Sequence, residues 1–393
     1  MEKLAAMKLT PAYVFDLDVL KTRICKIRET LGNRHGICFA MKANSFLVRP
    51  LLNLVDKLEV CSPGEFRICE RLSVPVERVV LSGVNKEEEE ILRVAGRYQG
   101  KGTYTIESVS HLQILNRCAC RCGCKLRVLL RISSGNQFGV DPDAAGKIIR
   151  SRSAYPNLEF AGIQQYTGTQ KKKSKKIAAE LEELDMLLKR WQEEYGYEAE
   201  ELEYGPGLFV PYFRNEEKKA GEDELKELAE MLERLNFRGK ITLEMGRYLT
   251  ADCGYFFTRV VDCKENFGEK YAIVDGGIHH MTYYGQSMAM KLPHCGHIAA
   301  DRDKAGILDR HEELWNICGS LCTSGDMLAK KMPFTNLAIH DILVFENLGA
   351  YSVTEAMYLF LSRDMPKVYF YSKEAGVTLV RDTISTHLWN GEI

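Results

Sequence analysis

The chain has 393 residues, and its 53 basic and 54 acidic side chains leave a net charge of −1 at pH 7. This balance excludes the strongly positive field by which proteins bind nucleic acid or anionic membranes. Every apolar stretch is shorter than the roughly 20 residues of a membrane span, and the first ten residues lack the apolar run of a signal peptide. We therefore expect a cytoplasmic protein of two domains with a small-molecule partner.

Thirteen cysteines are scattered along the chain, an odd number that is typical of reduced thiols rather than of a disulfide framework. The segment RCACRCGCK, residues 117–125, places a cysteine at every second position. These cysteines are Cys118, Cys120, Cys122 and Cys124. Zinc sites usually pair cysteines as C-x2-C, and the flanking basic residues are typical of exposed segments. We therefore predict an exposed loop here in preference to a metal or redox site.

Short apolar runs alternate with amphipathic helical stretches from residue 17 to about residue 245. The runs are GICFAM (36–41), LEVCS (58–62), VVLS (79–82), TYTI (103–106), LRVLLRI (126–132), EFAGIQQ (159–165), EELEY (200–204) and KITLE (240–244). Such alternation predicts parallel strands joined by helices. Eight strands within roughly 250 residues predict a closed (β/α)8 TIM barrel, with an open doubly wound sheet as the alternative.

The helical stretches between these runs carry apolar stripes at helical spacing, which we expect to pack on the barrel. The clearest stripes are Leu20, Ile24, Ile27 and Leu31, and later Ile177, Leu181, Leu184, Leu188 and Trp191. A basic run, KKKSKK (171–176), precedes the second stripe and is followed by acidic residues. We therefore interpret it as a solvated face rather than as a phosphate-binding patch.

Beyond residue 245 the pattern changes to short strand-like segments bounded by turns. They are FFTRVVDCKEN (256–266), YAIVDGG (271–277), DILVFENLGAYSV (341–353) and KVYFYS (367–372). The opening TPAYVFD (10–16) is strand-like too, and we expect it to pair with this later sheet. The predicted organisation is a barrel over residues 17–245, with 1–16 and 246–393 forming a mostly antiparallel β-sandwich or β-barrel domain.

Polar residues at the carboxyl ends of barrel strands are the first candidates for chemistry. Lys42 ends the first strand and Glu244 ends the eighth, and these two strands are neighbours in a closed barrel. Desolvation lowers the pKa of a lysine in a dry site, and a neutral amine can attack a carbonyl. The alternative is an ion pair between Lys42 and a carboxylate such as Glu59 or Glu65.

A glycine pair after the seventh strand adds a second feature of this predicted site. In YGPGL (204–208), Gly205 and Gly207 leave backbone N–H groups free to bind a phosphate, as barrel loops after strand seven often do. A strand-end lysine, a strand-end glutamate and a phosphate cradle together outline a site for pyridoxal phosphate.

The second predicted domain adds Cys322 in the small-residue loop NICGSLCTSGD, where an accessible thiol is a candidate acid or nucleophile. Tyr351 ends a strand-like segment, where it serves a turn or reaches a ligand. His279 and His280 are adjacent, and adjacent side chains on an extended chain point apart, so we predict no metal site there.

Ten segments in order make the chain resemble the fold-type-III pyridoxal phosphate-dependent decarboxylases, the family of diaminopimelate and ornithine decarboxylase, whose barrel alanine racemase shares. The segments are TPAYVFD, CFAMKANS, EVCSPGEF, RISSGNQFGV, GIQQYTGTQ, EYGPGLFVPY, EMGRYL, VDGG, CGSLCTSGD and LGAYSV. The resemblance covers nearly the whole chain. It implies pyridoxal phosphate as cofactor and a homodimer with shared active sites.

The resemblance also implies roles for individual residues. Lys42 would bind the cofactor covalently and Glu244 would pair with its ring nitrogen. The phosphate would be bound by Thr169, Gly205, Gly207, Arg247 and Tyr351. The substrate in the partner subunit's site would be faced by Cys322, Thr323 and Asp326, and the proton donor would be Cys322 or Lys42. Tyr166 stands where many members stack a histidine on the ring. Gln164 stands where a histidine is common, and Pro206 replaces a glycine and removes one N–H donor from the cradle.

The same resemblance bears on the reaction. A glutamate at the ring nitrogen favours decarboxylation, whereas alanine racemase presents an arginine there. In enzymes that act on lysine, ornithine or diaminopimelate, an acidic residue follows the cysteine, and here that residue is Thr323. We therefore expect an amino-acid decarboxylase of the secondary-metabolite type, acting on an unusual or carrier-protein-bound substrate. The alternatives are diaminopimelate decarboxylase, a racemase and a non-catalytic binding protein.

Overall fold

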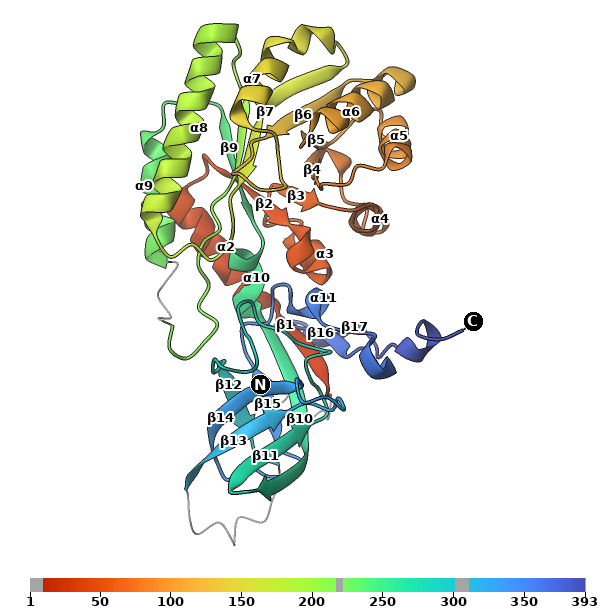
Figure 1. The fold of residues 1–393 in the computed structure, drawn as a ribbon, viewed down its shortest axis with the longest axis vertical. Helices are drawn as coiled ribbons and strands as arrows, with labels where there is room; N and C mark the ends of the chain where they lie inside the picture. Colours follow the sequence, from red (N-terminus) through yellow and green to blue (C-terminus); the bar gives the residue numbers. More distant parts are fainter. Residues whose placement is uncertain (1–9, 217–221, 301–310, 393) are drawn as a thin grey trace. The chain divides into compact units, whose positions relative to one another are not determined.

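The computed structural model describes residues 10–216, 222–300 and 311–392 (Figure 1). The chain divides into two compact units. The first comprises Met1–Arg23, Pro211–Lys218 and Thr250–Ile393, and the second comprises Ile24–Val210 and Lys219–Leu249. We call the first the sheet unit and the second the barrel unit.

The barrel unit contains a closed barrel of eight parallel strands, which confirms the predicted barrel and shows the open-sheet alternative to be wrong. The strands are β2 (Gly36–Ala40), β3 (Lys57–Val60), β4 (Val79–Leu81), β5 (Thr103–Ile106), β6 (Leu126–Arg131), β7 (Leu158–Tyr166), β8 (Glu201–Gly205) and β9 (Lys240–Met245). The barrel closes through parallel pairing of β2 with β9, in which Cys38 faces Glu244. Each strand coincides with one of the predicted apolar runs to within two residues at either end.

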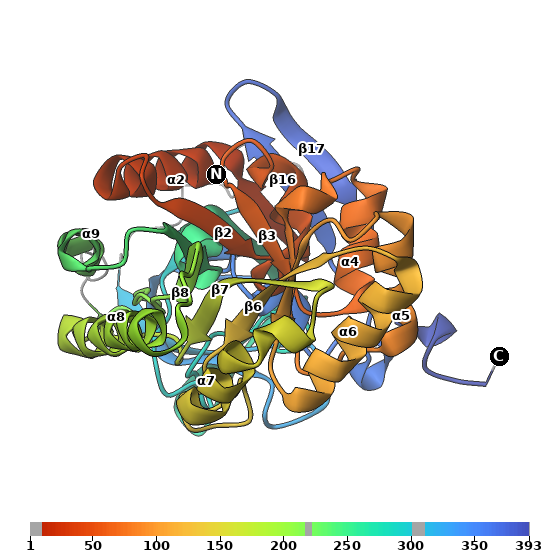
Figure 2. The same ribbon diagram turned by 90° about the horizontal axis from the view of Figure 1, so that it is seen from above.

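Helices connect the strands and surround them (Figure 2). They are α2 (Leu17–Leu31), α3 (Val48–Leu51), α4 (Pro63–Arg71), α5 (Glu88–Arg97), α6 (Val109–Cys122), α7 (Pro142–Arg150), α8 (Ser174–Tyr195), α9 (Glu222–Arg234) and α10 (Arg247–Thr250). Side-chain oxygens of Ser62, Ser108 and Asp141 accept hydrogen bonds from the first turns of α4, α6 and α7, so these helices begin where a capping residue stands. The apolar stripes predicted for α2 and α8 are buried.

The alternating cysteines lie on and just after α6, so the prediction of an exposed loop is wrong. Cys118 is buried, and Cys122 follows it by one helical turn on the same face as Leu115. The helix ends at Gly123, whose φ of 59° is the left-handed conformation that terminates many helices. No group of three potential metal ligands occurs in the part of the chain that the structure describes.

The basic run 171–176, which overlaps the first turn of α8, is only partly a solvated face. Lys172, Lys173, Lys175 and Lys176 are exposed, as predicted. Lys171 is buried, with 6% of its surface exposed, because it pairs with Glu180 of α8. The prediction of a solvated face is therefore wrong for this first lysine.

The sheet unit is built on a sheet of mixed but mostly antiparallel pairing. Its strands are β1 (Ala12–Asp16), β10 (Gly254–Asn266), β11 (Glu269–Val274), β12 (Cys295–Ile298), β13 (Glu312–Cys318), β14 (Met327–Thr335), β15 (Ile342–Phe345), β16 (Lys367–Ser372) and β17 (Gly376–Arg381). Strand β1 lies between β10, which it pairs antiparallel, and β16, which it pairs parallel. The expected pairing of the N-terminal segment with the later sheet is thus confirmed. Two short helices, α11 (Ser352–Glu355) and a 3-10 turn at Phe360–Ser362, precede β16.

Strand β1 is buried on both faces of this sheet, since Tyr13 and Phe15 are buried as fully as Ala12 and Val14. A core cluster of buried side chains forms on one of these faces: Ala12, Val14, Phe257, Ile342, Val344 and Tyr369. Because successive side chains on a strand point to opposite faces, Ala12 and Val14 share one face of β1. Burial of these β-branched and aromatic side chains holds the first strand in the sheet.

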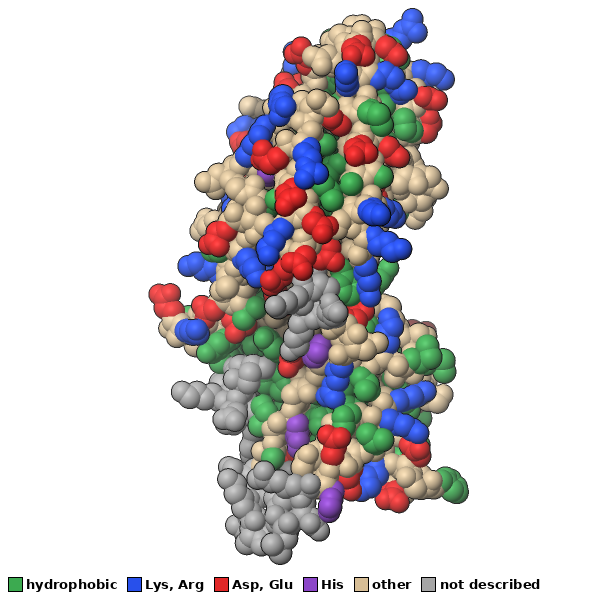
Figure 3. All heavy atoms as spheres, turned by 90° about the vertical axis from the view of Figure 1, so that its left-hand side faces the viewer, with side chains coloured by type: hydrophobic (Ala, Val, Ile, Leu, Met, Phe, Trp, Pro, Cys, Tyr) green, Lys and Arg blue, Asp and Glu red, His purple; other side chains and the backbone are tan. Residues whose placement is uncertain are grey.

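The surface in Figure 3 carries basic and acidic side chains interspersed, in keeping with the balanced composition. Within the described ranges, no helix has the length and apolar character needed to cross a membrane.

Candidate active site

Lys42 lies two residues beyond the carboxyl end of β2, in the 3-10 turn Met41–Ala43. Its Nζ lies 2.7 Å from Glu59 Oε2 and 3.4 Å from Glu244 Oε1, and 37% of its side chain is exposed. The site is therefore less dry than predicted, and the ion pair with Glu59 is formed. Glu65 instead accepts a hydrogen bond from the Cys61 N–H, at 2.6 Å. The amine of Lys42 is thus held between two carboxyl groups while remaining open to solvent.

The two carboxyl groups differ in protonation. Burial, together with the charge of Glu59, raises the pKa of Glu244 to about 7. Burial acts in the same direction on Glu59, but the Lys42 ammonium and its hydrogen bond prevail and lower the pKa of Glu59 to about 2. At neutral pH, Glu59 is therefore the anion that pairs with Lys42. Glu244 exchanges a proton in this range, so it can share one with a basic nitrogen of a ligand.

A third buried carboxyl group, Glu203 of β8, lies beside this pair and was missed from the sequence. Gln164 of β7 donates a hydrogen bond from Nε2 to Glu203 Oε1 at 2.7 Å and a longer one to Glu244 Oε2 at 3.4 Å. Burial raises the pKa of Glu203 to about 8. The signal was present in the sequence: in ELEYG, Glu201 and Glu203 stand two residues apart, so both point into the barrel. Glu201 pairs with Lys57.

The loops after β7 and β8 meet at the predicted phosphate cradle. A Cβ on Gly207 would lie 2.0 Å from the Gly168 carbonyl oxygen, and Gly207 has a φ of +62°. Only glycine fits this close approach. Arg247, at the start of α10, donates from Nε to Thr169 Oγ1 at 3.3 Å. A buried guanidinium and a turn of small residues therefore lie together, as anion binding requires.

Tyr166 ends β7 and lies over Gly205, which ends β8. A Cβ on Gly205 would stand 2.5 Å from Tyr166 Cδ2, so the glycine leaves room for the aromatic ring. Burial and the nearby Glu244 raise the pKa of Tyr166, and the opposing effect of the Lys42 and Arg247 charges is smaller. The ring of Tyr166 is therefore placed among the predicted site residues.

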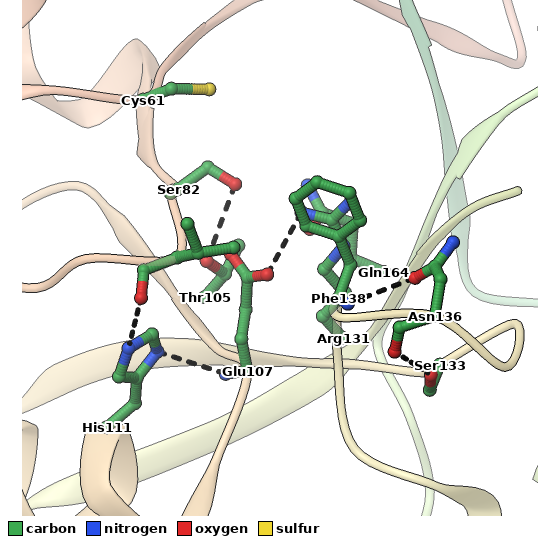
Figure 4. Close-up of polar contacts among 12 residues, drawn as sticks. Cys61, Ser82, Thr105, Glu107, His111, Arg131, Ser133, Asn136, Phe138 and Gln164 are labelled. Atoms are coloured by element: carbon green, nitrogen blue, oxygen red, sulfur yellow. Dashed lines mark hydrogen bonds and ion pairs between the residues drawn. The ribbon is translucent and has the colours of Figure 1, made fainter. Parts of the chain in front are cut away.

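A polar network crosses the carboxyl ends of β4, β5 and β6 (Figure 4). Arg131 donates to Glu107 Oε2 at 3.1 Å, and its guanidinium lies 4.7 Å from the centre of the Phe138 ring. Lys86 is buried and donates to the Thr105 hydroxyl at 3.3 Å and to carbonyl oxygens. Burial lowers the pKa of Lys86 to about 8. None of these residues was singled out from the sequence, since polar groups within loops and strand ends carry no periodic signal.

The other predicted site residues lie in the sheet unit. Cys322 and Thr323 are exposed on a loop between β13 and β14. Asp326 is buried, and its two carboxylate oxygens accept hydrogen bonds from the N–H groups of Ile278 and Leu321 at 2.8 and 2.7 Å. Asp326 therefore shapes this loop. Tyr351, with a φ of +63°, precedes α11.

The adjacent histidines of the sheet unit do not point apart as predicted. The rings of His279 and His280 lie 3.7 Å apart, because the chain turns here instead of running as a strand. Burial lowers the pKa of His279 to about 3 and that of His280 to about 4, so both rings are neutral at pH 7.

The sequence matches known proteins over most of its length. Residues 17–251 match the family model of the pyridoxal-dependent decarboxylases, pyridoxal binding domain. Diaminopimelate decarboxylase of Aquifex aeolicus is 28% identical over 89% of this chain and 84% of its own length. The L-glutamyl-[BtrI acyl-carrier protein] decarboxylase of Niallia circulans is 26% identical over 96% of this chain and 94% of its own.

Solved structures agree in fold. Diaminopimelate decarboxylase from M. jannaschii in complex with L-lysine superposes with a TM-score of 0.86 over 100% of this chain and 94% of that one, at 23% identity. The AQ1208 protein of Aquifex aeolicus superposes with a TM-score of 0.84 over 99% of this chain and 92% of that one, at 26% identity. The likeness to the first structure shows the fold alone.

The residues at the barrel mouth fit the cofactor of this family. Lys42 provides an accessible amine for the aldehyde. Glu244 is a buried carboxyl group that titrates near neutrality and suits the ring nitrogen, and the Arg247 guanidinium lies beside a glycine turn that suits the phosphate. Buried Gln164 Oε1 and Glu203 Oε2 accept no hydrogen bond from the described residues. The chain belongs to the pyridoxal-dependent decarboxylase family, and it is an amino-acid decarboxylase whose cofactor is pyridoxal phosphate.

Proposed function

We propose that the barrel mouth binds pyridoxal phosphate through Lys42, Glu244 and the cradle formed by Thr169, Gly207 and Arg247. The observation that carries this proposal is the position of the partly exposed Lys42 amine, 2.7 Å from the buried Glu59 and 3.4 Å from the buried Glu244. Lys42 supplies the amine for the aldehyde, and Glu59 orients it. Tyr166 would lie against the cofactor ring, and Gly205 leaves space for the Tyr166 side chain.

The chemistry follows from these positions. Bound pyridoxal phosphate supplies an electron-accepting ring that stabilises the electron pair left on Cα when CO2 departs. Glu244 would hold a proton at the ring nitrogen, which its raised pKa of about 7 allows near neutral pH. Cys322, exposed on its loop, is the proposed donor of the proton that replaces CO2 on Cα.

We further propose that the substrate is an unusual or carrier-bound amino acid rather than a diamino acid. The support comes from loop 319–326, where Asp326 is the acidic residue and both of its oxygens are occupied by backbone N–H groups. Thr323 presents a hydroxyl instead of a carboxylate, and Gly325 N–H points to that hydroxyl at 3.4 Å. The loop therefore offers a distal ammonium group no strong ionic partner.

The names of the relatives suggest two candidate substrates for this chain. The Niallia circulans relative acts on an L-glutamyl group carried by an acyl-carrier protein, and it spans nearly the whole of this chain. Diaminopimelate is the second candidate, favoured by the Aquifex aeolicus relative at 28% identity. A racemase is the weaker proposal, because the group beside Lys42 on β9 is a glutamate rather than an arginine.

A substrate panel tests this proposal. Purified holoenzyme is incubated with free diamino acids, free acidic amino acids and glutamyl thioesters, and CO2 release is measured alongside loss of optical rotation. We expect CO2 release from an acidic or thioester-linked substrate to exceed that from diaminopimelate and lysine. Faster CO2 release from diaminopimelate would contradict the substrate proposal, and loss of rotation without CO2 would indicate racemisation.

The Thr323→Glu variant tests the role of the loop directly. A carboxylate at this position would pair with a distal ammonium, so we expect higher kcat/KM for lysine-like substrates relative to wild type. Thr323→Gln has similar size without the charge and serves as the control. An equal effect of both variants would refute charge recognition at this position.

We also propose a homodimer with shared active sites, in which Cys322 and Thr323 serve the partner's barrel. The exposure of both side chains supports this proposal. Thirteen scattered cysteines are typical of a reducing compartment, which supports a cytoplasmic location.

A further inference from the structure

A buried ion pair lies behind the proposed phosphate cradle and takes no part in the chemistry described above. Lys171 donates from Nζ to Glu180 Oε2 at 2.6 Å, and the two residues are 6% and 8% exposed. Burial of a charged pair is costly, so a carboxylate in this place needs further hydrogen bonds. Glu180 receives them from Tyr204 OH at 2.5 Å and from Thr167 Oγ1 at 2.6 Å.

These partners come from three parts of the barrel unit. Thr167 and Lys171 flank the loop after β7, Tyr204 lies in β8, and Glu180 is in the second turn of α8. The single carboxylate therefore connects the two ends of the loop 167–171 with the strand beside it and with the helix that follows. Among the residues between these two ends, Gly168 lies against Gly207 and Thr169 accepts a hydrogen bond from Arg247.

Further contacts hold the same loop against the one after β8. Lys171 N–H donates to the Gly207 carbonyl oxygen at 2.9 Å. Gln170 bonds Val210 twice, with its Oε1 accepting from Val210 N–H at 2.7 Å and its Nε2 donating to the Val210 carbonyl at 2.9 Å. The shape of the cradle thus depends on residues that do not themselves face it.

We propose that Glu180 is a positioning residue for the phosphate group of the cofactor, acting through Thr167 and Lys171 to hold Gly168 and Thr169 against Gly207. This inference rests on the proposed assignment of the cradle to the phosphate. The cluster carries one negative and one positive charge, so it contributes shape to the cradle rather than net charge. Loss of Glu180 would leave the Lys171 ammonium buried without its carboxylate and would release Thr167.

The test compares ligands with and without the phosphate. Apoenzyme of wild type and of Glu180→Gln is titrated with pyridoxal phosphate and with pyridoxal, and each Kd is measured by the change in protein fluorescence. We expect Glu180→Gln to weaken pyridoxal phosphate binding by about tenfold or more, as loss of one charge-assisted hydrogen bond would do, with the Kd for pyridoxal nearly unchanged. Glu182→Gln, on an exposed position of α8, is the matched control and should change neither Kd.

Thr167→Val removes one hydrogen bond to Glu180 and leaves the ion pair, so it provides a second test if Glu180→Gln does not fold. It should shift the ratio of the two Kd values in the same direction. Equal weakening of both ligands, or no weakening of either, would overturn the positioning role. If wild type binds pyridoxal phosphate and pyridoxal equally, the assignment of the cradle to the phosphate fails, and this inference fails with it. If wild type and both variants prefer pyridoxal phosphate to the same degree, only the role of Glu180 is refuted.

Discussion

At the scale of single residues, protonation distinguishes groups that share one residue type. Glu59, Glu203 and Glu244 all lie buried at the barrel mouth, yet the Lys42 ammonium makes Glu59 the anion while burial raises the pKa of the other two. Sequence reasoning identified Lys42 and Glu244 from their places at strand ends. The sequence left open whether Lys42 is a neutral amine in a dry site or forms an ion pair. The distance from its amine to Glu59 is set by how the barrel strands pair, which the sequence alone does not give.

Lys42→Ala tests the amine. Removal of Nζ should abolish covalent attachment of the cofactor, so borohydride treatment followed by peptide mass spectrometry should find no pyridoxyl group on the variant. Wild type should carry the group on Lys42. We expect CO2 release to fall by at least about a thousandfold, the scale of losing a covalent catalyst. A reducible adduct on another lysine of the variant, such as Lys86, would refute the assignment.

The raised pKa of Glu203 predicts a pH-dependent stability. Between the ordinary value of 4.5 and about 8, the folded apoprotein holds a proton that the unfolded chain releases. Stability should therefore fall as pH rises through this window and become level above it. Glu203→Gln keeps the hydrogen bond from Gln164 without the titrating group, so its melting temperature should fall less between about pH 5 and pH 8. The same slope in the variant and in wild type would contradict the prediction.

At the scale of elements, periodic patterns of apolar residues in the sequence predicted the barrel strands and helices. The eight strands and the buried stripe of α8 followed from alternation and spacing in the sequence. The α6 segment was misjudged because cysteine alternation has a two-residue period, whereas the apolar stripe through Leu112, Leu115 and Ala119 has a helical one. Lys171 was misjudged because its burial depends on Glu180, nine residues away on the next helix.

Gly207→Ala tests the contact between the two cradle loops. The added Cβ would stand 2.0 Å from the Gly168 carbonyl oxygen at a φ of +62°, so the apoprotein should lose about 1–3 kcal/mol in urea unfolding. Pyridoxal phosphate affinity should fall as well. Gly196→Ala, at a φ of +56° with no atom within 4 Å, adds strain without collision and should cost only about 1 kcal/mol. Similar losses in the two variants would show that the close approach is unimportant.

At the scale of the whole molecule, the chain distributes its predicted site over two compact units. The amine, the carboxyl groups and the cradle belong to the barrel unit, whereas Cys322 and Tyr351 belong to the sheet unit. The change of sequence pattern after residue 245 predicted a second domain that holds Cys322 and Tyr351, and the family resemblance then implied that these residues belong to the site. The proposed dimer with shared sites remains a prediction.

Mixing two inactive variants tests the shared site. Lys42→Ala and Cys322→Ala each damage a different half of the proposed site, so a heterodimer would contain one intact site. Unfolding and refolding an equal mixture should restore about a quarter of wild-type CO2 release, given random pairing of subunits. Each variant refolded alone is the control. No recovery in a mixture that forms dimers would show that each chain completes its own site.

The place of β1 has a consequence for biosynthesis. This strand is translated before both of its neighbours, β10 and β16, which begin at Gly254 and Lys367. During translation both of its edges therefore wait without partners, and an exposed strand edge invites pairing with other chains. The sheet unit can complete the pairing of β1 only after β16 has been translated, so nascent chains stalled before Lys367 should be strong chaperone clients.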